Sequence, residues 1–127
     1  MPRVIHFEIH ADQPERAMRF YASVFGWQFT SLKGMPVDYW AVQTGDQGPG
    51  IDGGLMLRLT PLDSAAVTAF VATIAVPDLD QYVMKVATSG GQLAVPKMAI
   101  RGIGWFAYCK DTEGNLFGML EADAAAK

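Results

Sequence analysis

Hydrophobic and polar residues alternate with a period of two over residues 4–10, which predicts a β-strand. One face of this strand carries Ile5, Phe7 and Ile9, and the other carries His6, Glu8 and His10. The spacing then changes, with apolar residues at positions 17, 20, 21 and 24, which predicts a helix that ends at Gly26. Asp12 is expected to cap this helix, and Glu15 three residues later is typical of a capping box.

The same order of elements is predicted twice along the chain. Further strands are expected at residues 27–32, 38–44, 53–59, 69–76, 92–95, 104–110 and 115–121, with a second helix capped by Asp78. The predicted fold class is α+β, with two tandem β-α-β-β-β modules whose curved mixed sheets surround a cavity. The modules are expected at residues 1–59 and 67–122, with a linker at 60–66 and a frayed tail at 123–127.

An internal repeat supports the two modules, because the chain matches itself without gaps when it is shifted by 65 residues. Trp40 then falls on Trp105 and Gly53 on Gly118. The two tryptophans are therefore interpreted as symmetry mates. A shared packing role is favoured for them, with an aromatic wall for a ligand as the alternative.

Composition narrows the class of protein. The 127 residues are 50% hydrophobic and 18% charged, which is typical of one folded domain. A net charge of −3 offers no basic surface for nucleic acid. A single cysteine, Cys109, excludes an intramolecular disulfide and favours an inert buried thiol in a reducing compartment. With no signal peptide and no membrane-spanning segment recognised, a cytoplasmic protein is expected.

Two stretches of the chain resemble a known family. They are His6-Phe-Glu-Ile-His-Ala-Asp-Gln-Pro-Glu-Arg-Ala-Met-Arg-Phe-Tyr21 and Lys110-Asp-Thr-Glu-Gly-Asn-Leu-Phe-Gly118. Both are similar to the vicinal oxygen chelate superfamily, which includes glyoxalase I, bleomycin-resistance proteins and extradiol dioxygenases. Thr112 stands where proline is usual in the second stretch. The resemblance covers nearly the whole chain and is closest to proteins related to lactoylglutathione lyase, so it implies a glyoxalase-like fold.

The resemblance also implies where a metal would be bound. Members that use a metal take four ligands from the first and last strands of the two modules, and these positions match His6, Gly53, Val71 and Gly118 here. Only His6 carries a donor atom, since valine and glycine have no side-chain nitrogen or oxygen. Glu121, the carboxylate of the final strand, falls on the opposite face from Gly118. No metal or other cofactor is therefore expected, and a divalent metal held by His6 with rearranged ligands is the alternative.

Several side chains are candidates for contact with a ligand, namely His6, Glu8, His10, Trp40, Trp105 and Tyr108. Histidine and carboxylate side chains on one strand face can bind a polar ligand or transfer protons, so His6 and Glu8 are the catalytic candidates. The structural alternative is that the His6, Glu8 and His10 side chains only satisfy one another in a buried polar seam.

Three functions from different classes follow from these observations. The favoured one is a metal-free protein of this superfamily that binds a small organic molecule, with turnover left open. The second is a metal-dependent lyase or isomerase of glyoxalase type that uses His6. The third is a dimerisation or scaffolding domain without a ligand. The resemblance also implies a homodimer, and neither nucleic acid nor membrane is expected as a partner.

Overall fold

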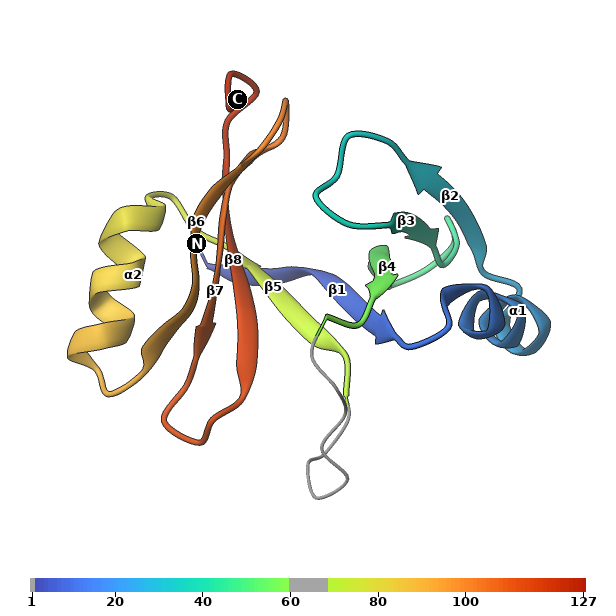
Figure 1. Cartoon of the computed structure of the whole chain (residues 1–127), viewed down its shortest axis with the longest axis horizontal. Coiled ribbons are helices and arrows are strands. Elements are labelled where there is room, and N and C mark those ends of the chain that lie inside the picture. The colour runs from blue at the N-terminus through green and yellow to red at the C-terminus, as the bar shows by residue number, and fades with distance from the viewer. Residues whose placement is uncertain (1, 60–68) are drawn as a thin grey trace. The chain divides into compact units, whose positions relative to one another are not determined.

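The computed structural model describes residues 2–59 and 69–127, and these form two helices and eight strands (Figure 1). In chain order they are β1 (Arg3–Ala11), α1 (Pro14–Phe25), β2 (Gln28–Leu32), β3 (Tyr39–Gln43), β4 (Gly53–Leu57), β5 (Val71–Ala75), α2 (Leu79–Thr88), β6 (Gln92–Ile100), β7 (Gly104–Lys110) and β8 (Leu116–Ala122). The α+β class and the doubled β-α-β-β-β order are confirmed. The predicted linker at 60–66 lies outside the described residues. Within them, no helix is long and apolar enough to span a membrane.

The chain divides into two compact units. The first unit comprises His6–Phe70, and the second comprises Met1–Ile5 together with Val71–Lys127. In the first unit the strand order is β2-β3-β4-β1, with β1 parallel to β4 and the other neighbours antiparallel. In the second unit the order is β5-β8-β7-β6, with β5 parallel to β8.

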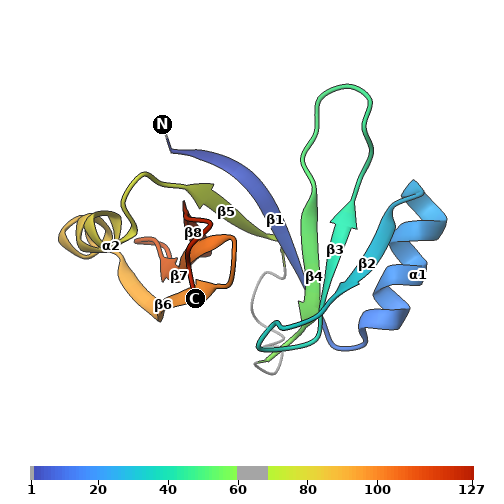
Figure 2. The same cartoon turned by 90° about the horizontal axis from the view of Figure 1, so that it is seen from above.

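Helix α1 packs on one face of the first sheet (Figure 2). The core between them contains Ile9, Ala11, Val42 and Leu55, bordered by aromatic rings that include Trp27 and Trp40. The helix ends as predicted, because Gly26 has a φ of 75° and its backbone N–H bonds the Ala22 carbonyl. These apolar contacts explain why the alternating pattern of β1 places its hydrophobic half toward the helix.

The predicted capping box of α1 is wrong. Gln13 occupies the N-cap position, and its side chain makes no capping hydrogen bond. The carboxylate of Asp12 instead accepts a hydrogen bond from Arg58 Nε at 3.0 Å. Pro14 at the first helical position has no N–H to satisfy, and its ring fixes φ, so the helix begins without a side-chain cap.

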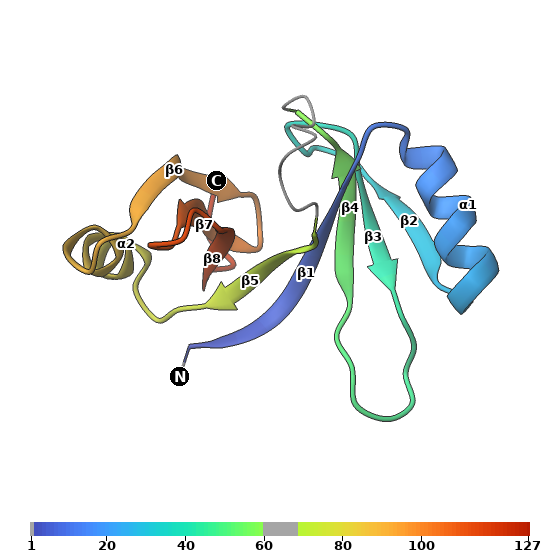
Figure 3. The same ribbon diagram turned by 90° about the horizontal axis from the view of Figure 1, so that it is seen from below.

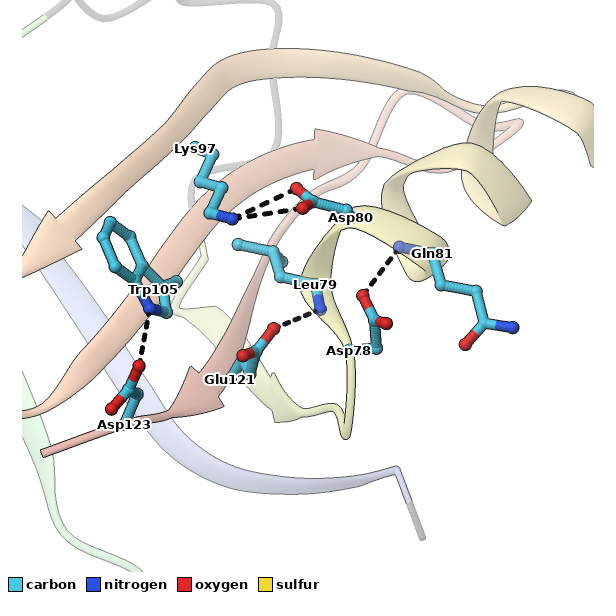
Figure 4. A network of polar contacts seen from close by, with 8 residues as sticks. All are labelled: Asp78, Leu79, Asp80, Gln81, Lys97, Trp105, Glu121 and Asp123. Carbon is cyan, nitrogen blue, oxygen red and sulfur yellow. Dashed lines mark hydrogen bonds and ion pairs between the residues drawn. The ribbon is translucent and has the colours of Figure 1, made fainter. Parts of the chain in front are cut away.

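Helix α2 covers one face of the second sheet (Figure 3). Leu79, Ala107, Cys109 and Met119 are buried between them. Asp78 caps this helix as predicted, because its carboxylate accepts from the Gln81 backbone N–H at 3.1 Å (Figure 4). The orphan N–H of Leu79 bonds the Glu121 carboxylate at 2.7 Å. Glu121 therefore accepts a hydrogen bond from the first turn of α2. It lies on the face of β8 opposite to Gly118, as the sequence predicts.

The C-terminal residues differ from the predicted frayed tail. Ala126 is only 2% exposed, and its carbonyl accepts a hydrogen bond from Gly102 N at 3.0 Å. Asp123 accepts a hydrogen bond from the Trp105 indole at 3.0 Å (Figure 4). These contacts hold the chain end against β7 and the turn before it.

The strand pairing corrects the register of the internal repeat. Ile9 and Ile74 keep the 65-residue shift, but Ile9 pairs with Leu55 while Ile74 pairs with Met119, a shift of 119 − 55 = 64. Leu55 in turn faces Trp40, and Met119 faces Ala107, a shift of 107 − 40 = 67. The counterpart of Trp40 is therefore Ala107, and the interpretation of the two tryptophans as symmetry mates is wrong.

The same strand pairing changes which glycine of the first unit corresponds to Gly118. Glu8 pairs with Gly54, and its counterpart Thr73 pairs with Gly118. Gly54, and not Gly53, is thus the counterpart of Gly118 on the face away from the helix. Gly53 pairs with Phe7, and a Cβ at Gly53 would meet the Phe7 ring at 2.7 Å.

Both units fill the space above these paired glycines with an aromatic ring from the neighbouring strand. A Cβ at Gly54 would overlap the Tyr39 hydroxyl, and a Cβ at Gly118 would overlap the end of the Phe106 ring. Tyr39 faces Met56, two residues beyond Gly54, and Phe106 faces Leu120, two residues beyond Gly118. The two rings therefore occupy equivalent places, and glycine is required because each ring lies over its Cα.

We predict that Gly118→Ala lowers the free energy of unfolding by about 1–3 kcal/mol, because the added methyl group would displace the Phe106 ring. Urea unfolding measures the change. The control is Gly50→Ala, since a Cβ there would meet no atom within 4 Å and Gly50 does not have a positive φ. The control is expected to change stability by less than about 0.5 kcal/mol. Equal stability of Gly118→Ala and wild type would show that the Phe106 ring does not exclude a side chain at this position.

Candidate functional site

The candidate site lies on the face of the first sheet that points away from α1. Directly paired residues project to the same side of a sheet. Glu8 pairs with Gly54, His10 pairs with Met56, and Met56 also pairs with Tyr39. The polar half of β1 and the Tyr39 ring therefore share one face, while the apolar half of β1 packs against the helix.

A chain of hydrogen bonds connects four side chains on this face. The Tyr39 hydroxyl donates to Glu8 Oε2 at 3.0 Å, and His6 Nε2 lies 3.1 Å from the Tyr39 oxygen. On the other side, His10 Nε2 lies 2.9 Å from Glu8 Oε1. Because the hydroxyl hydrogen of Tyr39 is directed at Glu8, its oxygen is left to accept from His6 Nε2–H. Glu8 is the centre of this chain and is only 5% exposed.

The electrostatics of His6 and Tyr39 follow mainly from their burial. Burial lowers the pKa of His6 below its ordinary value, although the nearby charges of Glu8 and Asp52 oppose that change. Burial, the Glu8 charge and the hydrogen bond to Glu8 all raise the pKa of Tyr39 well above its usual range. Near neutral pH the face therefore presents a neutral His6 imidazole and a protonated Tyr39 hydroxyl beside the Glu8 carboxyl.

The structure brings together three of the predicted contact residues, His6, Glu8 and His10, on one face of the first sheet. Trp40 packs with the α1 core on the other side of the first sheet. Trp105 packs with the α2 core, and its indole bonds Asp123 (Figure 4). We therefore leave both tryptophans out of the candidate site.

Tyr108 lies in the second unit on the sheet face opposite α2. It pairs with Gly118, and its ring meets that of Phe106 edge to face, with centroids 4.8 Å apart. Cys109 lies on the α2 side and is fully buried, and burial raises the pKa of its thiol. A buried thiol with a raised pKa is a poor nucleophile, in agreement with the inert role favoured from the sequence.

Tyr39 is the member of the candidate site that the sequence did not identify. It lies 31 positions from Glu8, and the glycine-rich loop before β4 hides the register that brings the two together. The signal that could have found it is Gly54, because an interior-facing glycine in a strand marks a close approach by another group.

The side chains at the family's metal positions offer too few donor atoms to hold a metal ion. With the register corrected, these positions are His6, Gly54, Val71 and Gly118, and only His6 provides a donor atom. The Tyr39 hydroxyl occupies the space into which a side chain at Gly54 would extend. Across residues 2–59 and 69–127, no group of three or more His, Cys, Asp or Glu side chains is arranged to hold a metal ion. The residues present therefore do not fit the family's metal site.

Comparison with known proteins identifies the family. Residues 3–119 match the model of the Glyoxalase/Bleomycin resistance protein/Dioxygenase superfamily, and the chain belongs to this superfamily. Among curated proteins, "Putative glyoxylase CFP32" from two Mycobacterium species, M. bovis and M. tuberculosis, is 29% identical over 91% of this chain. The chain spans 44% of the length of those relatives.

Solved structures show the same fold at low sequence identity. The hypothetical protein BH1468 from Bacillus halodurans C-125 has a TM-score of 0.70 and 15% identity, with 99% of this chain and 98% of that chain covered. Methylmalonyl-CoA epimerase from Mycobacterium tuberculosis has a TM-score of 0.63 and 16% identity, with 94% and 87% covered. The vicinal oxygen chelate fold predicted from the sequence is thereby confirmed.

We predict that His6 titrates below 6.5, its ordinary pKa, because burial disfavours the imidazolium. Below pH 6.5 the unfolded chain then binds a proton at His6 more tightly than the folded chain does. The free energy of unfolding should accordingly rise with pH from the folded pKa of His6 up to about 6.5. NMR titration of the imidazole, assigned with His6→Gln, measures the midpoint, and the same variant should lose this part of the pH dependence. A midpoint at or above 6.5 would contradict the prediction.

Proposed function

We propose that this protein binds a small organic molecule against the His6–Glu8–His10 face of its first sheet, without a metal at the family's ligand positions. The observation that carries the proposal is the Glu8 carboxyl, buried yet fixed by hydrogen bonds to Tyr39 and His10. Taking a carboxylate out of water costs several kcal/mol, and an apolar residue would pack a sheet face without that cost. A polar group kept there and oriented by its neighbours is typical of a pre-organised binding site.

The hydrogen-bonding roles on this face define the ligand chemistry. If His6 uses Nε2–H toward Tyr39 and His10 uses Nε2–H toward Glu8, both imidazoles keep Nδ1 as an acceptor. The Glu8 carboxyl adds negative charge and repels anions. The face thus favours a neutral or cationic molecule with hydroxyl or amine groups. Sequestration and turnover would both begin with this binding step.

The metal-free part of the proposal is tested by elemental analysis of the full chain purified without chelator. We expect well below one equivalent of nickel, zinc, iron or manganese per chain, because three of the family's four ligand positions are glycine or valine. Stoichiometric metal would contradict this and favour the alternative, a metal-dependent lyase or isomerase that uses His6. A melting temperature unchanged by chelator is the second expected result.

The binding part is tested by a thermal-shift screen with hydroxyl- and amine-bearing metabolites. We expect hits with wild type and a several-fold weaker affinity with Tyr39→Phe, because this substitution removes the hydroxyl that orients both His6 and Glu8. The matched control is Tyr82→Phe in α2. Lys85 Nζ lies over the Tyr82 ring, 4.6 Å from its centroid, and this substitution keeps the ring. Equal affinity of the two variants would place the ligand elsewhere, and an absence of hits with wild type would favour a scaffolding domain.

The proposal includes a homodimer, which the family resemblance implied. Light scattering on the full chain is expected to give twice the chain mass of 13.8 kDa. A mass of one chain at micromolar concentration would contradict it.

A further inference from the structure

A cavity of about 500 Å³ opens beside the first turn of α1, within the first unit. Its wall includes Asp12, Arg16, Phe20, Tyr21, Arg58 and Phe70. Ile9, Ala11 and Tyr21 of this wall belong to the core under α1, whereas the Tyr39–Glu8 hydrogen bond lies on the opposite face of the sheet. His10 is also part of the wall, and its carbonyl binds Arg58 Nη2. The cavity volume is sufficient for a small organic molecule.

The charges in the wall are unevenly paired. Arg58 is held by Asp12 through Nε at 3.0 Å and by the His10 carbonyl through Nη2 at 2.8 Å. Arg16 makes no hydrogen bond or ion pair with any described residue. Two guanidinium groups therefore face one carboxylate, and the cavity has an excess of one positive charge.

The rest of the wall offers aromatic surface that a ligand would cover. Phe20 is 57% exposed, and its ring meets Tyr21 edge to face at 5.1 Å. Phe70 is 48% exposed, and its centroid lies 5.5 Å from Phe7 and 6.0 Å from Tyr21. Tyr21 itself stacks on Trp27 with centroids 5.2 Å apart, so the exposed rings pack against further aromatic residues.

We propose that this cavity is a second binding site and that its ligand is a small aromatic carboxylate. The carboxylate would pair with Arg16, because a guanidinium binds a carboxylate through two parallel hydrogen bonds. Arg58, already fixed in place by Asp12 and the β1 backbone, adds positive potential beside it. The ring of the ligand would cover the exposed faces of Phe20 and Phe70.

The ligand class is opposite in charge to the one expected on the Glu8 face. A carboxylate is repelled by Glu8 but attracted by the arginine pair, so the two sites would select different molecules. Binding here does not depend on the function proposed for the Glu8 face.

The test is calorimetric titration of the full chain with benzoate. We expect saturable binding with a Kd of about 1 mM, as befits a ligand of this size. Benzyl alcohol, which has the ring without the charge, and inorganic phosphate, which has the charge without the ring, should each bind at least about tenfold more weakly.

Substitutions then locate the site. Arg16→Gln should weaken benzoate binding about tenfold or more, and Phe70→Leu should weaken it several-fold. Arg19→Gln is the matched control. Arg19 is exposed on the same helix and does not line the cavity, and its substitution removes the same charge. Melting temperatures of all three variants confirm folding.

Four results would overturn the proposal. Benzoate binding that does not saturate would exclude the site. An equal loss of benzoate affinity in Arg16→Gln and Arg19→Gln would show that the binding is general electrostatic attraction. Phosphate binding as tightly as benzoate would exclude the aromatic class. Benzoate binding unaffected by Arg16→Gln would place the carboxylate elsewhere.

Discussion

The hydrogen bond between the Tyr39 hydroxyl and Glu8 is the contact on which the arrangement of the first sheet's polar face depends. A carboxylate in this buried position requires donors, and the Tyr39 ring can supply one only by lying over the backbone of β4. That close approach requires a residue without a side chain, which explains Gly54. The positions of His6 and His10 follow, because each imidazole completes one end of the same chain of hydrogen bonds.

The second unit uses the same steric solution with different chemistry. Phe106 lies over Gly118 as Tyr39 lies over Gly54, but the second ring has no hydroxyl and faces Thr73 where the first unit has Glu8. In the first unit the ring is therefore part of a polar network, whereas in the second unit a ring without a hydroxyl lies beside the Thr73–Gly118 pair. In both copies a ring occupies the place that a glutamate ligand would need. This chain thus keeps the superfamily's fold while its own side chains fill the metal-ligand positions.

The two faces around β1 also differ in the molecules they suit. Away from the helix, imidazole nitrogens and a carboxylate favour ligands that donate hydrogen bonds. Beside the start of α1, arginine side chains and exposed rings favour an aromatic anion. The period-two alternation of β1 contributes to this difference, because neighbouring side chains project to opposite sides of the sheet. The two sites that we propose would in this way share one strand and differ in charge preference.

Local patterns in the sequence were sufficient to predict the element order, the apolar faces, the Asp78 cap, the end of α1 and the polar row of β1. Each of these depends on local periodicity or on contacts within a few residues, and Glu8 and its two histidines are neighbours on one strand. The pairing of strands in the folded chain was needed to establish that Tyr39 binds Glu8, that Gly54 and not Gly53 pairs with Glu8, and that Trp40 and Trp105 are not equivalent. It also diverted Asp12 from the helix cap to Arg58. These features depend on the register between strands. A change of one or two residues in loop length shifts that register, and it leaves no local pattern in the sequence.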